Sequence, residues 1–231
     1  MRKKTKIICT IGPASESPAV LKKLVKGGAN VFRLNFSHGD HEEHAKRIQD
    51  IQTLRKEMNM PIGIMLDTKG PEIRIKTFQQ TPVELAEGDT FTLTTRDVEG
   101  TKEIVSITYE GLPQDVQPGT VILIDDGLVA MEVLEVKDGT DIVCKVKNGG
   151  QLSNRKGVNV PGVDVKLPSI TEKDIDDILF GIQQGIDFIA ASFIRKAQDV
   201  LEIRQLLQEN GGEGIQIISK IECHQAIVNI E

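Results

Sequence analysis

The chain has 231 residues, of which 39% are hydrophobic, enough for a buried core in one large domain or two smaller ones. Only 3% are aromatic and the formal net charge is −6, which argues against stacking platforms for single-stranded nucleic acid and against general binding to nucleic acid or an anionic membrane. No apolar run approaches the ~20 residues of a membrane span, and the three cysteines form no CxxC pair, so we expect a cytoplasmic protein without signal peptide, disulfide framework or structural zinc.

The first part of the chain alternates strand and helix patterns. Helix-start signals at Ser17-Pro18 and at Asp40 each precede apolar residues at helical spacing. These patterns predict strands over residues 6–11, 30–37 and 61–67, with helices between them. The third strand is an almost uninterrupted apolar run, which is typical of a parallel sheet buried on both faces.

From about residue 70 to residue 168 the pattern changes. Short strand-like runs are separated by turn signals such as Glu87-Gly88 and Pro118-Gly119, and no convincing helix pattern occurs. This stretch predicts a small antiparallel barrel or sandwich inserted into the α/β chain. Within it, Asp125-Asp126-Gly127 fits a hairpin turn better than an acid pair that reaches a ligand.

After the insert the strand–helix alternation resumes. A capping-box start at Thr171 and Asp174 opens one helix, a second helix is predicted over 197–210, and strands are predicted over 187–192 and 215–222. Five strands with an all-β insertion after the third predict an α/β fold, an incomplete (β/α)8 TIM-type barrel. The domains expected are barrel segments at 1–69 and 169–231 and an inserted domain at 70–168. The alternative is an open doubly wound sheet, which the absence of a GxGxxG fingerprint disfavours.

In such barrels the chemistry lies at the carboxyl ends of the strands. All five predicted strands end in polar residues, which are Thr10 to Ser15, Arg33 to His38, Asp67 to Arg74, Ser192 to Lys196, and Lys220 with Glu222. Unpaired charges gathered at one end of a barrel would be costly, so a ligand or catalytic site is favoured over separate caps and salt bridges.

The residue types at these ends indicate a reaction class. Arginine and lysine bind phosphate, carboxylates bind Mg²⁺ or Mn²⁺, and the second and third strand ends offer oxygens to a further cation. No Walker A or kinase glycine loop is present in the sequence. The residues alone therefore predict a metal-assisted site for a phosphorylated metabolite.

Six motifs in a fixed order carry a resemblance to a known family. They read KTKIICTIGPAS, RLNFSHG, LDTKGPEIR, KGVNVPG, DFIAASFIRKAQDV and SKIE. Together they closely resemble pyruvate kinase from residue 3 to residue 231. The resemblance implies phosphoryl transfer from phosphoenolpyruvate to ADP, giving pyruvate and ATP in glycolysis, with Mg²⁺ (or Mn²⁺) and K⁺ as cofactors.

The resemblance also implies a role for each matching residue. Arg33 and Lys220 match catalytic residues that bind the transferring phosphate, Lys220 also neutralising the forming enolate, and Glu222 matches one of two carboxylates on the divalent ion. A K⁺ cage is implied for Asn35, Ser37, Asp67 and the carbonyl of Thr68. Nucleotide binding is implied for Asn35, His38, Arg74 and Lys156, the last from the insert, which is implied to act as a lid. Glu72 matches a position that is Glu in K⁺-dependent members and Lys in members that need no K⁺, so it implies K⁺ dependence.

The chain also departs from the family pattern. The family's second metal carboxylate, its proton-transfer threonine and its C-terminal domain, which carries the effector sites and the contacts of the homotetramer, all lie beyond the fifth strand. Cys223 and Ala226 stand where the family usually has Asn and Gly. We therefore expect residues 1–231 alone to be inactive. The alternative is a non-catalytic fragment that at most binds nucleotide or phosphate.

Three other interpretations compete with these roles. Arg33 could form only a structural salt bridge with Asp67. The histidines of His41-Glu42-Glu43-His44 are three apart rather than four as in a zinc HExxH motif, so an exposed acidic helix N-terminus is favoured. Lys220 could form a Schiff base, although Glu222 two residues later favours metal chemistry.

Overall fold

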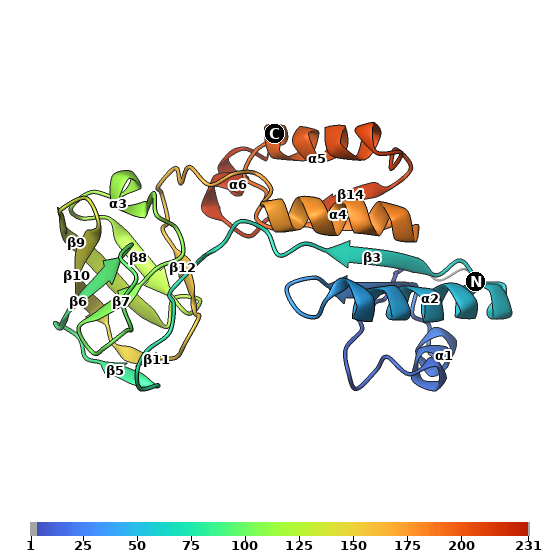
Figure 1. Ribbon diagram of the computed structural model, residues 1–231, viewed down its shortest axis with the longest axis horizontal. Helices are drawn as coiled ribbons and strands as arrows, with labels where there is room; N and C mark the ends of the chain where they lie inside the picture. The colour runs from blue at the N-terminus through green and yellow to red at the C-terminus, as the bar shows by residue number, and fades with distance from the viewer. Residues whose placement is uncertain (1–3, 231) are drawn as a thin grey trace. The chain divides into compact units, whose positions relative to one another are not determined.

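The computed structural model describes residues 4–230, which form two compact units (Figure 1). The first unit comprises the chain up to Pro71 together with the segment from Ser169 onward, and the second comprises Glu72–Pro168. Residues 1–3 and 231, which fall within the outermost predicted segments, lie outside the described residues. Among residues 4–230 no helix is long and apolar enough to cross a bilayer.

The first unit is built on a five-stranded sheet with the order β1-β2-β3-β13-β14. Its strands are β1 (Ile8–Thr10), β2 (Val31–Asn35), β3 (Gly63–Asp67), β13 (Phe188–Ala191) and β14 (Gln216–Ser219), and all neighbours are parallel. Its helices are α1 (Pro18–Lys26), α2 (His41–Met58), α4 (Glu172–Gln184), α5 (Ala197–Glu209) and α6 (His224–Val228). The strands follow one another in chain order without reversal, as in a (β/α)8 barrel and unlike a doubly wound sheet. The predicted incomplete (β/α)8 barrel is therefore confirmed.

Helix α2 begins where its sequence predicts, after Asp40. The Asp40 side chain accepts a hydrogen bond from the backbone N–H of Glu43 at 2.9 Å, and Asn59 ends the helix with φ of 48°. The helix N-terminus is exposed only in part, because the His44 ring is buried and stacks on Phe36 with ring centroids 3.9 Å apart. Burial lowers the pKa of His44 below its ordinary value.

Helix α4 has the predicted capping box, in which Thr171 and Asp174 each accept a hydrogen bond from the other residue's backbone N–H. Its apolar residue Ile178 is buried, but Asp174 and Asp177 are buried as well. The Asp177 carboxylate is paired with His41 at 2.8 Å and with Lys173 at 2.6 Å. Apolar spacing alone did not predict this buried acidic face, because its partners lie partly on another helix.

The last strand is shorter than the predicted range of 215–222. Strand β14 ends at Ser219, and Lys220 and Glu222 lie in the loop before α6. The backbone N–H of Lys220 still donates to the carbonyl of Ala191 at 2.9 Å. Pairing stops there because Ala191 is the last residue of the neighbouring strand. Glu222 therefore belongs to a loop and not to the sheet.

The second unit consists of strands with one short helix. Its strands are β4 (Ile73–Arg74), β5 (Val83–Leu85), β6 (Thr90–Thr94), β7 (Ile104–Ser106), β8 (Val121–Ile124), β9 (Val129–Lys137), β10 (Asp141–Asn148), β11 (Gly150–Leu152) and β12 (Gly157–Asn159). Seven of them form a sheet in the order β4-β12-β8-β9-β10-β6-β7, and β11 pairs with β5. All these pairs are antiparallel except β6 with β7.

Two local features of the second unit concern the sequence predictions. Asp125 and Asp126 both have positive φ, 54° and 55°, between the antiparallel strands β8 and β9, so the predicted hairpin turn is confirmed. Helix α3 (Leu112–Asp115) was not predicted, because four residues are too few for a helical period to show.

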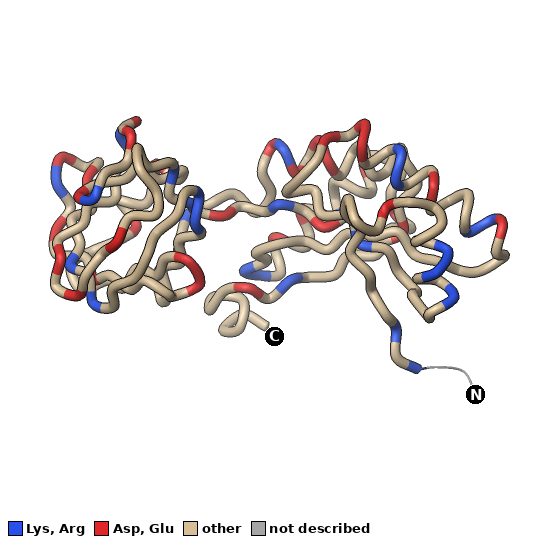
Figure 2. Tube along the Cα trace, turned by 90° about the horizontal axis from the view of Figure 1, so that it is seen from below, with Lys and Arg blue, Asp and Glu red and all other residues tan. Residues whose placement is uncertain are grey.

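Figure 2 shows acidic and basic residues interspersed along both units.

We expect the excised segment 70–168 to fold by itself. It buries its own apolar cluster, which includes Phe91, Ile122 and Ile142 and shares no member with the cluster of the first unit. A far-UV circular dichroism melt should therefore show a cooperative transition. The Ile122→Asp variant, which places a charge in this core, should show none, and a flat melt for the unaltered segment would count against an independent domain.

Candidate active site

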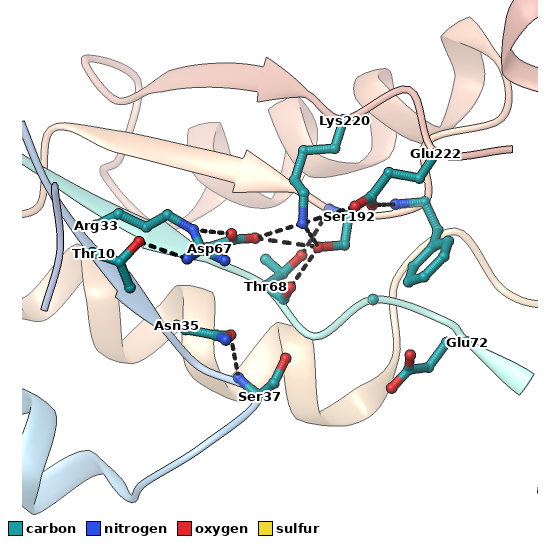
Figure 3. A network of polar contacts seen from close by, with 12 residues as sticks. Thr10, Arg33, Asn35, Ser37, Asp67, Thr68, Glu72, Ser192, Lys220 and Glu222 are labelled. Atoms are coloured by element: carbon teal, nitrogen blue, oxygen red, sulfur yellow. Dashed lines mark hydrogen bonds and ion pairs between the residues drawn. The ribbon is translucent and has the colours of Figure 1, made fainter. Parts of the chain in front are cut away.

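The carboxyl ends of β2, β3, β13 and β14 gather the polar residues of the first unit (Figure 3). Parallel pairing in register places Asn35 beside Asp67, and Asp67 beside Ala190. Ser192 follows β13 directly and Lys220 follows β14 directly. Residues that are far apart in the sequence thus meet because their strands are neighbours in the sheet.

Asp67 lies at the centre of this group and its side chain is 2% exposed. Its Oδ2 is paired with Nε of Arg33, and its Oδ1 accepts from Nζ of Lys220 at 3.1 Å. Nη1 of Arg33 donates in addition to the hydroxyl of Thr10 at 2.8 Å. Two cations thus pair with one buried carboxylate, and Glu222 adds a second, partly exposed carboxylate beside Lys220.

The cations of this group remain accessible to a ligand. The side chains of Arg33 and Lys220 are 29% and 28% exposed. The salt bridge between Arg33 and Asp67 therefore forms, as the structural interpretation predicts, but it leaves part of the guanidinium free to meet an anion. Pairing with Asp67 fixes the direction of the side chain, so the salt bridge and a ligand-binding role are compatible.

Lys220 is held by three acceptors. Its Nζ lies 3.1 Å from Oδ1 of Asp67, 2.9 Å from Oγ of Ser192 and 3.2 Å from Oε1 of Glu222. An ammonium has three N–H donors, so this set matches its capacity. Two carboxylates among the acceptors suit a fixed positive charge and not the free amine that Schiff-base formation needs.

Glu222 is oriented by the loop after β13. Its Oε2 accepts a hydrogen bond at 3.0 Å from the backbone N–H of Phe193, which has φ of 54°. The other oxygen faces Lys220. Cys223 and Ala226, the two departures from the family pattern, lie at the N-cap of α6 and inside it, where Ala226 is buried.

The oxygens predicted to hold a monovalent cation come from the ends of β2 and β3. Asn35 and Asp67 are register partners, Ser37 and Thr68 follow, and Oδ1 of Asn35 accepts from the backbone N–H of Ser37 at 3.0 Å. This donor set has one carboxylate and otherwise neutral oxygens, which fits a hard cation of low charge. Within residues 4–230 no group of three or more His, Cys, Asp or Glu side chains is arranged to hold a metal.

The remaining predicted residues are divided between the two units. His38 is exposed just after β2, where its carbonyl contacts the His44 ring at 2.9 Å. In the second unit Arg74 is paired with Glu72 through both carboxylate oxygens, and Nζ of Lys156 lies 2.9 Å from Asp125. These contacts lie within one unit each, and the roles implied for these residues stay predictions.

Two residues of the group have no role in the sequence predictions. Ser192 contacts Lys220, Asp67 and Thr68, and Thr10 contacts Arg33. Both stand at predicted strand ends, and that position was their one signal in the sequence. A single hydroxyl carries no distinctive chemistry, so only the register of the neighbouring strands reveals what it touches.

Known proteins similar to this chain indicate its family. The family model "Pyruvate kinase, barrel domain" matches residues 2–231. The pyruvate kinases of Bacillus licheniformis and Geobacillus stearothermophilus are both 56% identical to the chain, over 99% and 100% of its length and 39% and 40% of their own. That of Staphylococcus aureus (strain MRSA252) is 50% identical over 99% of the chain and 39% of its own length. The chain thus spans about two fifths of these curated relatives, and it belongs to the pyruvate kinase family.

Proposed function

We propose that this chain supplies the phosphate-binding part of a pyruvate kinase active site. In the reaction, the bond between phosphorus and the enolate oxygen of phosphoenolpyruvate breaks and a bond to the terminal phosphate oxygen of ADP forms. The released enolate then takes up a proton to give pyruvate. The observation that carries the proposal is the pairing of two partly exposed cations, Arg33 and Lys220, with one buried carboxylate, Asp67, at adjoining strand ends.

Arg33 and Lys220 divide the work on the phosphoryl group. The arginine, fixed by Asp67 and Thr10, would bind the phosphate oxygens with its remaining donors. The lysine, fixed by three acceptors, would offset the negative charge on the phosphoryl group and on the enolate oxygen as the bond breaks. Because both cations are held before the substrate arrives, little reorganisation is needed during transfer.

Two metal ions complete this proposal. A divalent ion, Mg²⁺ or Mn²⁺, would be held in part by Glu222, and K⁺ by Asn35, Ser37, Asp67 and the carbonyl of Thr68. Both would add positive charge beside the transferring group. Glu72, as the residue implied to determine K⁺ dependence, leads us to propose that K⁺ is required.

The nucleotide part of the proposal draws on both units. Asn35, His38, Arg74 and Lys156 would contact ADP or ATP, and the second unit would act as a lid. In a longer protein of this family, the reaction would take place in the cytoplasm and in a homotetramer. These statements rest on the family pattern at the matching residues.

A completed chain tests the proposal. In it, residues 1–231 replace the matching segment of the Geobacillus stearothermophilus pyruvate kinase. We expect turnover of phosphoenolpyruvate and ADP in a lactate-dehydrogenase-coupled assay by the completed chain, and none by residues 1–231 alone. The physical reason is that β1 and β14 are the outer strands of an open sheet, so the unit lacks the other strand ends of a closed barrel.

Two results would contradict these expectations. Turnover by residues 1–231 alone, abolished by Lys220→Met, would show that the remaining strand ends are not needed. A folded completed chain that does not turn over, while the relative's own enzyme does, would reject the proposed function. A fragment that only binds nucleotide or phosphate would then be the better description.

A further inference from the structure

Ser192 occupies a special place among the strand ends. Strand β13 lies between β3 and β14 in the sheet, and Ser192 is the first residue after it. The residue is 4% exposed. Its side chain therefore lies between Thr68, which follows β3, and Lys220, which follows β14 (Figure 3).

The hydrogen bonds of the Ser192 hydroxyl have a fixed direction. Lysine can only donate, so Oγ of Ser192 accepts from Nζ of Lys220 at 2.9 Å. The hydroxyl has one proton, and the carbonyl of Thr68 at 2.6 Å is a nearer acceptor than Oδ1 of Asp67 at 3.3 Å. The hydroxyl thus connects the ammonium of Lys220 to the main chain after β3.

This connection supplies the neutral contact of Lys220. Its other two acceptors, Asp67 and Glu222, are carboxylates on different elements. A lysine side chain has a flexible stem of four carbons, and two carboxylates alone attract its charge without fixing one direction. The Ser192 hydroxyl is the third acceptor, and its own bond to the Thr68 carbonyl sets the direction in which it accepts. It therefore fixes the position of the Lys220 ammonium.

Ser192 is itself held on two sides. Its backbone N–H donates to the hydroxyl of Thr68 at 3.0 Å. On another side, a Cβ added to Gly70 would lie only 2.6 Å from Cβ of Ser192, so the backbone at Gly70 packs directly against the serine. These contacts fix the backbone and Cβ of Ser192, and the hydrogen bond to the Thr68 carbonyl holds its hydroxyl beside Lys220.

We propose that Ser192 is a positioning residue for phosphoryl transfer, which acts by holding the Lys220 ammonium where charge develops. This inference rests on the proposed function of Lys220. An interaction with charge that develops during the reaction affects the transition state more than the bound substrate. Loss of the hydroxyl should therefore lower kcat and leave the KM for phosphoenolpyruvate nearly unchanged.

The test compares two buried serines in the completed chain. Ser192→Ala should reduce kcat roughly 10- to 100-fold, the scale expected for misplacing a reacting group, with KM for phosphoenolpyruvate within about threefold. Ser106→Ala is the matched control, because Ser106 is also buried and its hydroxyl lies 2.6 Å and 3.0 Å from two backbone carbonyls within the second unit. This control should lose stability but keep kcat.

A second variant and a structure complete the test. Ser192→Cys fills the same place with a weaker acceptor and should lower kcat less than Ser192→Ala does, so it decides the matter if the alanine variant does not fold. Wild-type kcat in both variants, or a KM that rises with kcat unchanged, would overturn the inference. If the unaltered completed chain shows no turnover, the proposed function fails. A crystal structure of the Ser192→Ala variant then decides, because a Lys220 ammonium in its original position would overturn positioning by Ser192.

Discussion

Replacement of Lys220 by methionine in the completed chain is expected to reduce kcat by roughly 10²- to 10³-fold, the scale seen when one preorganised donor to developing charge is lost. Methionine keeps much of the apolar stem and removes the ammonium. The change also leaves Asp67 and Glu222 without one of their cations. Steady-state kinetics in the lactate-dehydrogenase-coupled assay measures the effect.

Lys173→Met is the matched control for this prediction. Lys173 is also paired with a buried carboxylate, that of Asp177, and it belongs to the same unit, but this ion pair lies within helix α4 and includes none of the strand-end residues. Its loss should destabilise the protein without lowering kcat. A kcat for Lys220→Met within about tenfold of the parent would contradict the role of Lys220, because that loss is smaller than the loss expected for one preorganised donor.

Replacement of Gly70 by alanine should be the most destabilising single change in the turn after β3, with a loss of roughly 2–5 kcal/mol in the free energy of unfolding. Gly70 has φ of +73°, which an alanine adopts only with strain. The new Cβ would also lie 2.6 Å from Cβ of Ser192. Both costs therefore act together at this position.

Gly211→Ala separates the two costs. Gly211 lies in the same unit with φ of +76°, but nothing lies within 4 Å of an added Cβ. It should lose only about 1 kcal/mol, the cost of the backbone conformation. Equal destabilisation by the two variants would show that the contact between Gly70 and Ser192 has no energetic effect.

The chain offers a separate probe for each unit in this measurement. Among the described residues, all helices except the four-residue α3 belong to the first unit, so ellipticity at 222 nm in a urea titration reports mainly on the unfolding of that unit. Tyr109 is the single tyrosine in a chain without tryptophan, and it lies in the second unit. Gly70→Ala should lower the urea midpoint of the ellipticity transition, which reports on the first unit. The midpoint of the tyrosine fluorescence transition, which reports on the second unit, should stay unchanged.

The sequence allowed the fold to be predicted where local signals are strong. Asp40 and Thr171 cap their helices by accepting a hydrogen bond from the backbone N–H three residues later, so the signal is local in the sequence. The apolar run of β3 predicts a strand that is buried on both faces, whichever strands lie beside it. The predicted end of the last strand, residue 222, was wrong, because the length of the neighbouring strand β13 decides where the pairing of β14 stops. The buried face of α4 was missed because His41, one partner of its acid Asp177, lies on a different helix.

The site could be predicted only as a set of residue types. Arg33, Asp67 and Lys220 stand at predicted strand ends, but their separation in the sequence gives no distances. The three residues come close together in space because β2, β3, β13 and β14 pair side by side as parallel strands. The positioning role proposed for Ser192 depends on which of two nearby acceptors its hydroxyl proton binds. No pattern in the sequence shows this choice.

The interruption of the first unit by the second affects how the chain folds during synthesis. Strand β3 must pair with β13 across the whole insert, and the backbone N–H of Gly70 meets the carboxylate of Asp174 at 3.0 Å. Closing a flexible loop of that length costs on the order of 4 kcal/mol in chain entropy. A ribosome releases Glu72–Pro168 before β13, so an insert that has already folded replaces a random loop by a body of fixed span. Once folded, the inserted unit therefore shortens the search of β3 for its neighbour β13.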